Sequence, residues 1–234
     1  PAPGKVVIDG KLDDWDLTGS RLMCYDVATM KDRLSGNVAF MWDSNYYYAS
    51  IRWRDPNPMV NGFDPLVDYG NSWRGDCVQL RIKTDRIAHV TAWYHAETKR
   101  PGMTIHWGPF KPKDHPDYGG LNDAMSAGAK QAFVMDKDGK GYTQEIAVPW
   151  NLLTREGNAL KAGDTMLSGV ELIYGKASGI DFPDHRYADN VSPKAKAGAS
   201  FFWVGDEAWG TLTLEKEGNL KLPPQTFKGE VAQE

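Results

Sequence analysis

Residues 37–53 read NVAFMWDSNYYYASIRW and contain two runs in which apolar side chains recur at every second position. In the first run Val38, Phe40 and Trp42 share one side, because successive side chains of a strand point to opposite faces. The second run repeats this pattern from Tyr47 onward. Between the runs lies Asp-Ser-Asn, a sequence typical of turns. The whole stretch therefore predicts a β-hairpin.

Further short runs of the same kind occur along the chain. They predict strands at residues 5–9, 76–84, 88–95, 131–135, 142–150, 165–175 and 209–215. A second hairpin is expected around DKDGKG, and a brief helical turn is expected at residues 150–155, after Pro149. The segments 96–130 and 175–203 are rich in Gly, Pro, Asp and Lys, so we expect two long irregular loops there.

The composition agrees with an all-β protein. Aromatic residues make up 12% of the chain, and 24 Gly and 14 Pro accompany them. Such content indicates an antiparallel β-sandwich, jelly-roll-like, with long loops. No shift in composition divides residues 5–215, so we expect one domain there and a linker or tail at residues 216–234.

Charge and hydropathy exclude several classes of protein. The net charge is −4 and no basic run is present, which argues against nucleic acid as a partner. No apolar run reaches the roughly 18 residues of a membrane helix, so we expect no membrane insertion. Two cysteines, Cys24 and Cys77, are too few for a disulfide scaffold or a zinc site, and the sequence leaves open whether they form one bridge.

Sequence motifs of catalysis are largely missing. The chain has no G-x-S-x-G, no H-E-x-x-H, no phosphate-binding glycine loop and no dinucleotide fingerprint. We therefore predict a non-catalytic domain. Acidic turns are the places where a structural calcium ion would bind, through carboxylate and backbone oxygens. The candidate ligands are Asp9, Asp13, Asp136 and Asp138, with ordinary turn chemistry as the alternative.

Residues 71–82, NSWRGDCVQLRI, place a tryptophan in a polar, glycine-bearing loop at the start of a predicted strand. The neighbours of Trp73 are Ser72, Arg74 and Gly75, so core packing does not explain it as well as it explains other tryptophans of the chain. Those assigned to the core are Trp15, Trp42, Trp53, Trp150 and Trp209.

Five stretches resemble family 9 carbohydrate-binding modules and their DOMON-like relatives in order and spacing. They are VVIDGKLDDWDLTG, YYYASIRWRDPNPMVN, WRGDCVQLRI, GYTQEIAVPWNLL and WGTLTLE, between residues 6 and 215. The resemblance implies an antiparallel β-sandwich that is extracellular or periplasmic. It also implies an oligo- or polysaccharide as ligand and, in many members, a fused or associated catalytic domain.

The resemblance implies a role for Trp73 as well. In the sugar-binding members two tryptophans sandwich a terminal sugar, and Trp73 and Trp203 match their placement. Phe201 or Phe202 is the alternative to Trp203 as the exposed partner. An indole on either side buries the apolar faces of a pyranose, while polar groups bind its hydroxyls. Gln79 falls where the family commonly has a glutamate, so a charge is lost there. Arg81, together with Arg100 or His95, would complete the polar rim.

An alternative is a haem b-binding electron-transfer domain similar to the haem subunit of ethylbenzene dehydrogenase. That subunit shares the sandwich and uses Met and Lys as axial ligands. The candidates in this chain are Met103, or another of the eight Met, together with Lys176. Methionine in a sandwich is usually core filler, however. No C-x-x-C-H is present, so covalent haem is excluded. A structural or interaction module is the remaining alternative.

Overall fold

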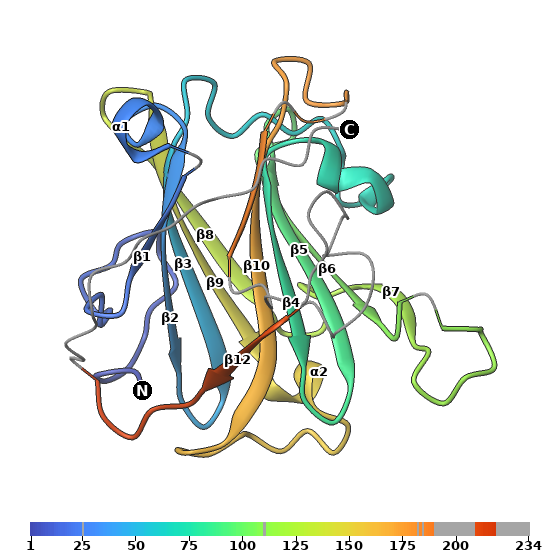
Figure 1. The fold of residues 1–234 in the computed structure, drawn as a ribbon. Helices are drawn as coiled ribbons and strands as arrows, with labels where there is room; N and C mark the ends of the chain where they lie inside the picture. The colour runs from blue at the N-terminus through green and yellow to red at the C-terminus, as the bar shows by residue number, and fades with distance from the viewer. Residues whose placement is uncertain (25, 110, 182, 184, 190–208, 219–234) are drawn as a thin grey trace.

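The structure is a computed structural model of two antiparallel β-sheets packed face to face (Figure 1). It describes residues 1–24, 26–109, 111–181, 183, 185–189 and 209–218. Residues 185–189 are described by their backbone only. The fold class expected from the sequence is confirmed.

The first sheet has the strand order β1-β2-β3-β9-β8. Its strands are β1 (Arg21–Met23), β2 (Ser35–Trp42), β3 (Tyr46–Arg54), β8 (Lys130–Met135) and β9 (Gly141–Pro149). The predicted hairpin is β2–β3, with Phe40 opposite Ala49. The second hairpin is β8–β9, whose turn contains Gly139 at φ +66°, a conformation that favours glycine.

The second sheet has the order β11-β10-β4-β5-β6-β7, and β12 also pairs with β10. Its strands are β4 (Cys77–Lys83), β5 (Ile87–His95), β6 (Arg100–Trp107), β7 (Gly120–Asp123), β10 (Thr165–Tyr174), β11 (His185–Asp189) and β12 (Gly210–Thr213). Three short helices complete the described elements: α1 (Val27–Met30), the 3₁₀ helix η1 (Tyr69–Arg74) and α2 (Trp150–Leu153), which follows Pro149 as expected. No helix in the described part of the chain is long and apolar enough to cross a membrane.

The core lies between the two sheets and draws on both of them. Ile51 and Trp53 of β3 meet Val78, Leu80 and Ile82 of β4 in one cluster of buried side chains. Of the tryptophans assigned to the core, Trp42 is only partly buried, and the other four are buried. Both cysteines are buried, and they do not form a disulfide with each other.

The outer side of the first sheet is covered by residues that precede β1. The strand expected at residues 5–9 is absent, so that prediction was wrong. Val6 and Ile8 instead pack on the sheet beside Trp15, without a strand partner. In this segment one side packs on the sheet and the other side faces water. An extended segment that crosses the surface of a sheet therefore shows the same alternation of apolar and polar side chains as a strand within a sheet.

Glu145 of β9 anchors this N-terminal segment. It is fully buried, and its carboxylate accepts hydrogen bonds from the Trp15 indole at 2.6 Å and from the backbone N–H of Asp9 at 2.9 Å and of Gly10. Burial raises the pKa of Glu145. The carboxylate therefore joins two of the stretches that carried the family resemblance.

Two expectations about loops were also wrong. The segment 96–130 contains β6 and β7, and the segment 175–203 contains β11. Glycine and proline inside β6, at Pro101 and Gly102, hid its pattern. Gly102 is required there, because a Cβ would come within 2.5 Å of the Trp93 ring.

Candidate functional site

The outer side of the second sheet, away from the core, carries polar side chains. Val78, Leu80 and Ile82 of β4 belong to the core cluster, so Gln79 and Arg81 point to the opposite side. The strand register extends this side over the neighbouring strands. Gln79 lies between Glu171 of β10 and Thr91 of β5, and Thr91 lies opposite Thr104 of β6.

A second row runs parallel to the first. Arg81 lies between Gly169 of β10 and His89 of β5, and His89 lies opposite His106 of β6. The seven polar side chains of the two rows form what we call the polar face: Gln79, Arg81, His89, Thr91, Thr104, His106 and Glu171.

Four members of the polar face are almost completely buried. Gln79, Arg81, Thr104 and Glu171 are between 2% and 4% exposed. Burial of polar groups is costly unless they are hydrogen-bonded, and buried ionisable side chains cost most. A sheet surface that only faced water would not need such an arrangement. The polar face is therefore the strongest candidate for a binding site.

Hydrogen bonds within the face orient its central amide. The Arg81 guanidinium donates to the Gln79 side-chain oxygen at 2.5 Å, and the Gln79 amide nitrogen donates to the Thr91 hydroxyl at 3.3 Å. A donor on one side and an acceptor on the other fix which way the amide points. Gln79 thus holds Arg81 and Thr91 in place at the same time.

The pKa values of both histidines of the face are lowered, which favours the neutral imidazole. Burial lowers the pKa of His89 far below its ordinary value, and the nearby Arg81 and His106 lower it further. Burial also lowers the pKa of His106, again with a contribution from Arg81. A neutral imidazole offers one donor and one acceptor. Both rings are thus able to bind hydroxyl groups without adding charge.

Trp73 lies at one end of the polar face. It belongs to η1, which ends just before β4, and packs partly buried on Cys77, Trp93 and Ile173. These three residues form the next row of the same side of the sheet. The sequence placed Trp73 at the start of a strand, and the structure adds that its ring borders the polar face.

Asp76 anchors the loops around Trp73. Its side chain is buried, and its two oxygens accept hydrogen bonds from the backbone N–H of Val60 at 2.8 Å and of Gly175 at 2.7 Å. Burial raises the pKa of Asp76 well above its ordinary range, and the nearby Asp55 raises it further. The residue immediately before β4 therefore ties two loops to the end of the site.

The other expected site residues differ in placement. Arg100 is exposed at the start of β6, on the same side of the sheet as Thr104 by strand alternation. His95 is buried, and its Nδ1 lies 2.7 Å from the Thr98 hydroxyl, which indicates a structural role. Trp203 lies outside the described residues, so its proposed position opposite Trp73 stays a prediction.

Sequence reasoning missed five members of the polar face: His89, Thr91, Thr104, His106 and Glu171. The alternation of β5 was visible in the sequence, and aligning it with β4 would have found His89 and Thr91. Glu171 required knowing that β10, distant in sequence, pairs with β4. Thr104 and His106 required β6, which was not predicted.

The expected calcium ligands are spread over the first sheet and its cover. Asp136 and Asp138 both bind the guanidinium of Arg54, at 3.2 and 3.0 Å. Asp9 pairs with Lys11 at 3.4 Å, and Asp13 is exposed. Within the described ranges no three His, Cys, Asp or Glu side chains are grouped to hold a metal ion. The residues present do not fit calcium at these four positions, and binding itself stays an untested prediction.

The residue pair offered for haem does not form a site either. Met103 is 1% exposed and belongs to the core cluster between the sheets. Lys176 is exposed in the loop after β10. A core thioether and an exposed ammonium cannot bind the same iron from opposite sides, so this pair gives no support to the haem alternative.

Comparison with known proteins finds likeness in structure alone. No protein-family model matches the chain, and a search of curated proteins finds no match. Two solved structures are of a family 9 carbohydrate-binding module from Caldicellulosiruptor kristjanssonii, one in complex with glucose and one with cellotriose. The glucose complex has a TM-score of 0.60 at 15% identity and covers 95% of this chain and 97% of its own. The cellotriose complex has a TM-score of 0.57 at 15% identity and covers 95% and 96%. The chain therefore shares their fold.

Proposed function

We propose that this protein is a non-catalytic carbohydrate-binding module that holds a sugar on the polar face, against Trp73. One observation carries the proposal: nearly buried polar side chains gather on the outer side of a sheet, beside a partly exposed indole. The similar structures in complex with glucose and cellotriose support the same class of ligand.

The chemistry of a pyranose matches this arrangement. Its C–H faces are apolar and stack on an indole, while its hydroxyls need both donors and acceptors. Arg81 supplies donors, Glu171 supplies acceptors, and the neutral imidazoles supply one of each. The finer proposal is that the sugar is a chain end, held between Trp73 and Trp203, with Gln79 and Arg81 reading its hydroxyls.

The setting of the module is part of the proposal. An oligo- or polysaccharide would be the partner, outside the cell or in the periplasm, and a catalytic domain that is fused or associated would act on the same polymer. A module of this kind raises the local concentration of that domain at its substrate.

A glycan array followed by calorimetry on the best glycan tests the proposal. We expect Glu171→Gln to weaken binding at least tenfold, because a hydrogen bond to a charged group is lost, worth about 1.5–3 kcal/mol. Glu97→Gln is the matched control, since Glu97 is exposed in the turn before β6. No binding to any glycan, or equal affinities of the two variants, would contradict the proposed site.

A further inference from the structure

A cavity of about 140 Å³ lies at the end of the sandwich remote from Trp73. Residues of β12 line it, and β12 pairs with β10 near Leu167, which lies opposite Lys83 at the far end of β4. Trp73 precedes the other end of β4, about 20 Å away at 3.3 Å per residue. The cavity is therefore separate from the polar face.

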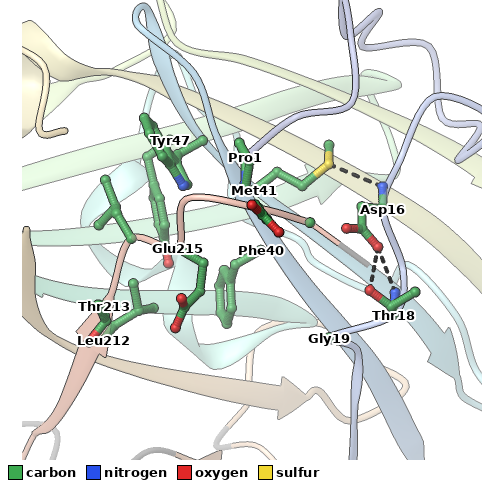
Figure 2. A pocket seen from close by; sticks show the side chains of 14 residues that line it. Pro1, Asp16, Thr18, Gly19, Phe40, Met41, Tyr47, Leu212, Thr213 and Glu215 are labelled. Carbon is green, nitrogen blue, oxygen red and sulfur yellow. Dashed lines mark hydrogen bonds between the residues drawn. The ribbon is translucent and has the colours of Figure 1, made fainter. Parts of the chain in front are cut away.

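Aromatic rings form one wall of the cavity. Phe40, Trp42 and Tyr47 line it, and the rings of Phe40 and Tyr47 stack with centroids 5.7 Å apart and planes 12° apart. In Figure 2 Phe40 lies between Leu212 and Thr213 on one side and Asp16 and Thr18 on the other. Such a wall offers a surface on which apolar C–H groups of a ligand can pack.

Two donors in this wall are buried, and one of them has no acceptor among the described residues. The Trp42 indole N–H is buried and has no hydrogen-bond partner in the described part of the chain. The Tyr47 hydroxyl is buried beside Ser168. Buried polar groups without partners are rare and costly, so an oxygen-bearing ligand would stabilise them.

The rim of the cavity is acidic. Asp16, Glu215 and Glu217 line it, and Asp16 accepts hydrogen bonds from the backbone and hydroxyl of Thr18. Among the described residues that line the cavity there is no Lys or Arg, and the three carboxylates outnumber the α-amino group of Pro1, which also lines it. The local potential is therefore negative, which attracts cations and repels anions.

We propose that this cavity is a second sugar site, selective for a saccharide unit that bears a protonated amine. A hydrocarbon amine would leave the Trp42 N–H without an acceptor, and a uronic acid would be repelled by the rim. An amino sugar satisfies all three features: its C–H groups pack on the rings, its hydroxyls accept from the buried donors, and its ammonium faces the carboxylates.

Titration of the ¹⁵N-labelled full chain with glucosamine, glucose and glucuronate tests this proposal, because the three sugars differ mainly in charge. At a pH where the amine is protonated, glucosamine should shift the indole N–H signal of Trp42 saturably. Its affinity should exceed that of glucose by about three- to fivefold, the scale of an exposed ion pair, and glucuronate should bind weakest. No saturable shift, or equal affinity for glucose and glucosamine, would overturn the proposal.

Variants separate the two sites. Glu215→Gln should reduce the preference for glucosamine over glucose, whereas Glu97→Gln should leave it unchanged. Trp42→Phe keeps a ring and removes the N–H, so it should weaken binding of both sugars, as followed on the backbone signal of Thr213. Trp73→Ala should leave the Trp42 shift intact, and loss of that shift would show that a single site is involved. The outcome at this cavity is thus independent of whether the polar face binds sugar.

Discussion

Single side chains set the properties of the proposed site. Gln79 is the clearest case, because its amide accepts from Arg81 and donates to Thr91. Replacing it would release two neighbours at once and change the order of donors and acceptors offered to a ligand. We therefore expect Gln79→Ala to change which sugars are preferred more than it changes the affinity for the best one, as a glycan array would show.

Trp73→Ala tests the proposed stacking surface. We expect affinity to fall by about 2 kcal/mol or more, the scale of a binding hot spot. Stability should fall only modestly, because the ring is partly exposed where it packs on Trp93. Calorimetry with the best glycan and thermal melts of the same samples measure both. A sharp fall in melting temperature with binding retained would assign Trp73 to the core.

His89 gives the protein a dependence on acid. Its pKa in the folded state lies below the ordinary value of 6.5, so below that pH the unfolded chain binds a proton that the folded chain does not. Its contribution to stability is therefore present above about pH 6.5 and is lost as the pH falls, at up to about 1.4 kcal/mol per unit.

The measurement is urea denaturation between pH 7 and pH 5. The free energy of unfolding should fall less steeply with decreasing pH in His89→Gln than in the unsubstituted protein. Glu145 and Asp76 have raised pKa values and act in the opposite direction, but they are common to both samples. His115→Gln, at a partly exposed position, is the control, and a slope equal to that control would contradict the prediction.

At the scale of elements, β9 stabilises a segment that is not a strand. Glu145 holds the N-terminal residues through a carboxylate that accepts from Trp15, and that hydrogen bond joins two regions 130 residues apart. The outer side of the first sheet is consequently covered by an N-terminal segment that forms few backbone hydrogen bonds with the strands.

Trp15→Phe measures this anchor. The variant removes a donor to a carboxylate, so we expect the free energy of unfolding to fall by about 2–3 kcal/mol. Trp107→Phe is a matched comparison, because the Trp107 indole donates to the neutral carbonyl of Leu152 at 2.8 Å. Its loss should cost about 1 kcal/mol. Equal losses in urea denaturation would mean that the charge of Glu145 adds nothing.

The sequence predicted those elements whose side chains alternate clearly. β2, β3, β4, β5, β8, β9 and β10 were all expected within a few residues of their observed bounds. β6 was missed because Pro101 and Gly102 interrupt its alternating pattern. β1 was missed because a strand of three residues is too short to show an alternating pattern. The segment at residues 5–9 alternates without pairing, since packing on a sheet imposes the same period as belonging to one.

At the scale of the whole molecule, the site depends on pairing between distant strands. Trp73, Gln79 and Arg81 were predicted from the family resemblance, whose motif covers one strand and the residues immediately before it. Glu171 was not, because its place beside Gln79 follows from contact between β4 and β10, 92 residues later in the chain. Local patterns identify the residues that one strand contributes to a site, and the fold supplies those of its neighbours.

Calcium is best tested on the intact protein. An ion bound only to the folded state stabilises it by RT ln(1 + [L]/Kd), so its removal would lower the melting temperature. Since Arg54 already lies between Asp136 and Asp138, we expect a chelator to leave the melting temperature unchanged. A clear decrease, reversed by added calcium, would restore the original expectation.

The cavity remote from Trp73 has one further consequence, for engineering. Pro1 and Gly218 both line it, so the two ends of the described fold come together there. Neighbouring ends favour circular permutation and insertion into another protein. A permuted chain that joins Gly218 to Pro1 through a short linker, and opens at Gly139, should fold. Inserted into a host loop through the ends at Pro1 and Gly218 instead, the unpermuted fold would direct the end that carries Trp73 away from the host.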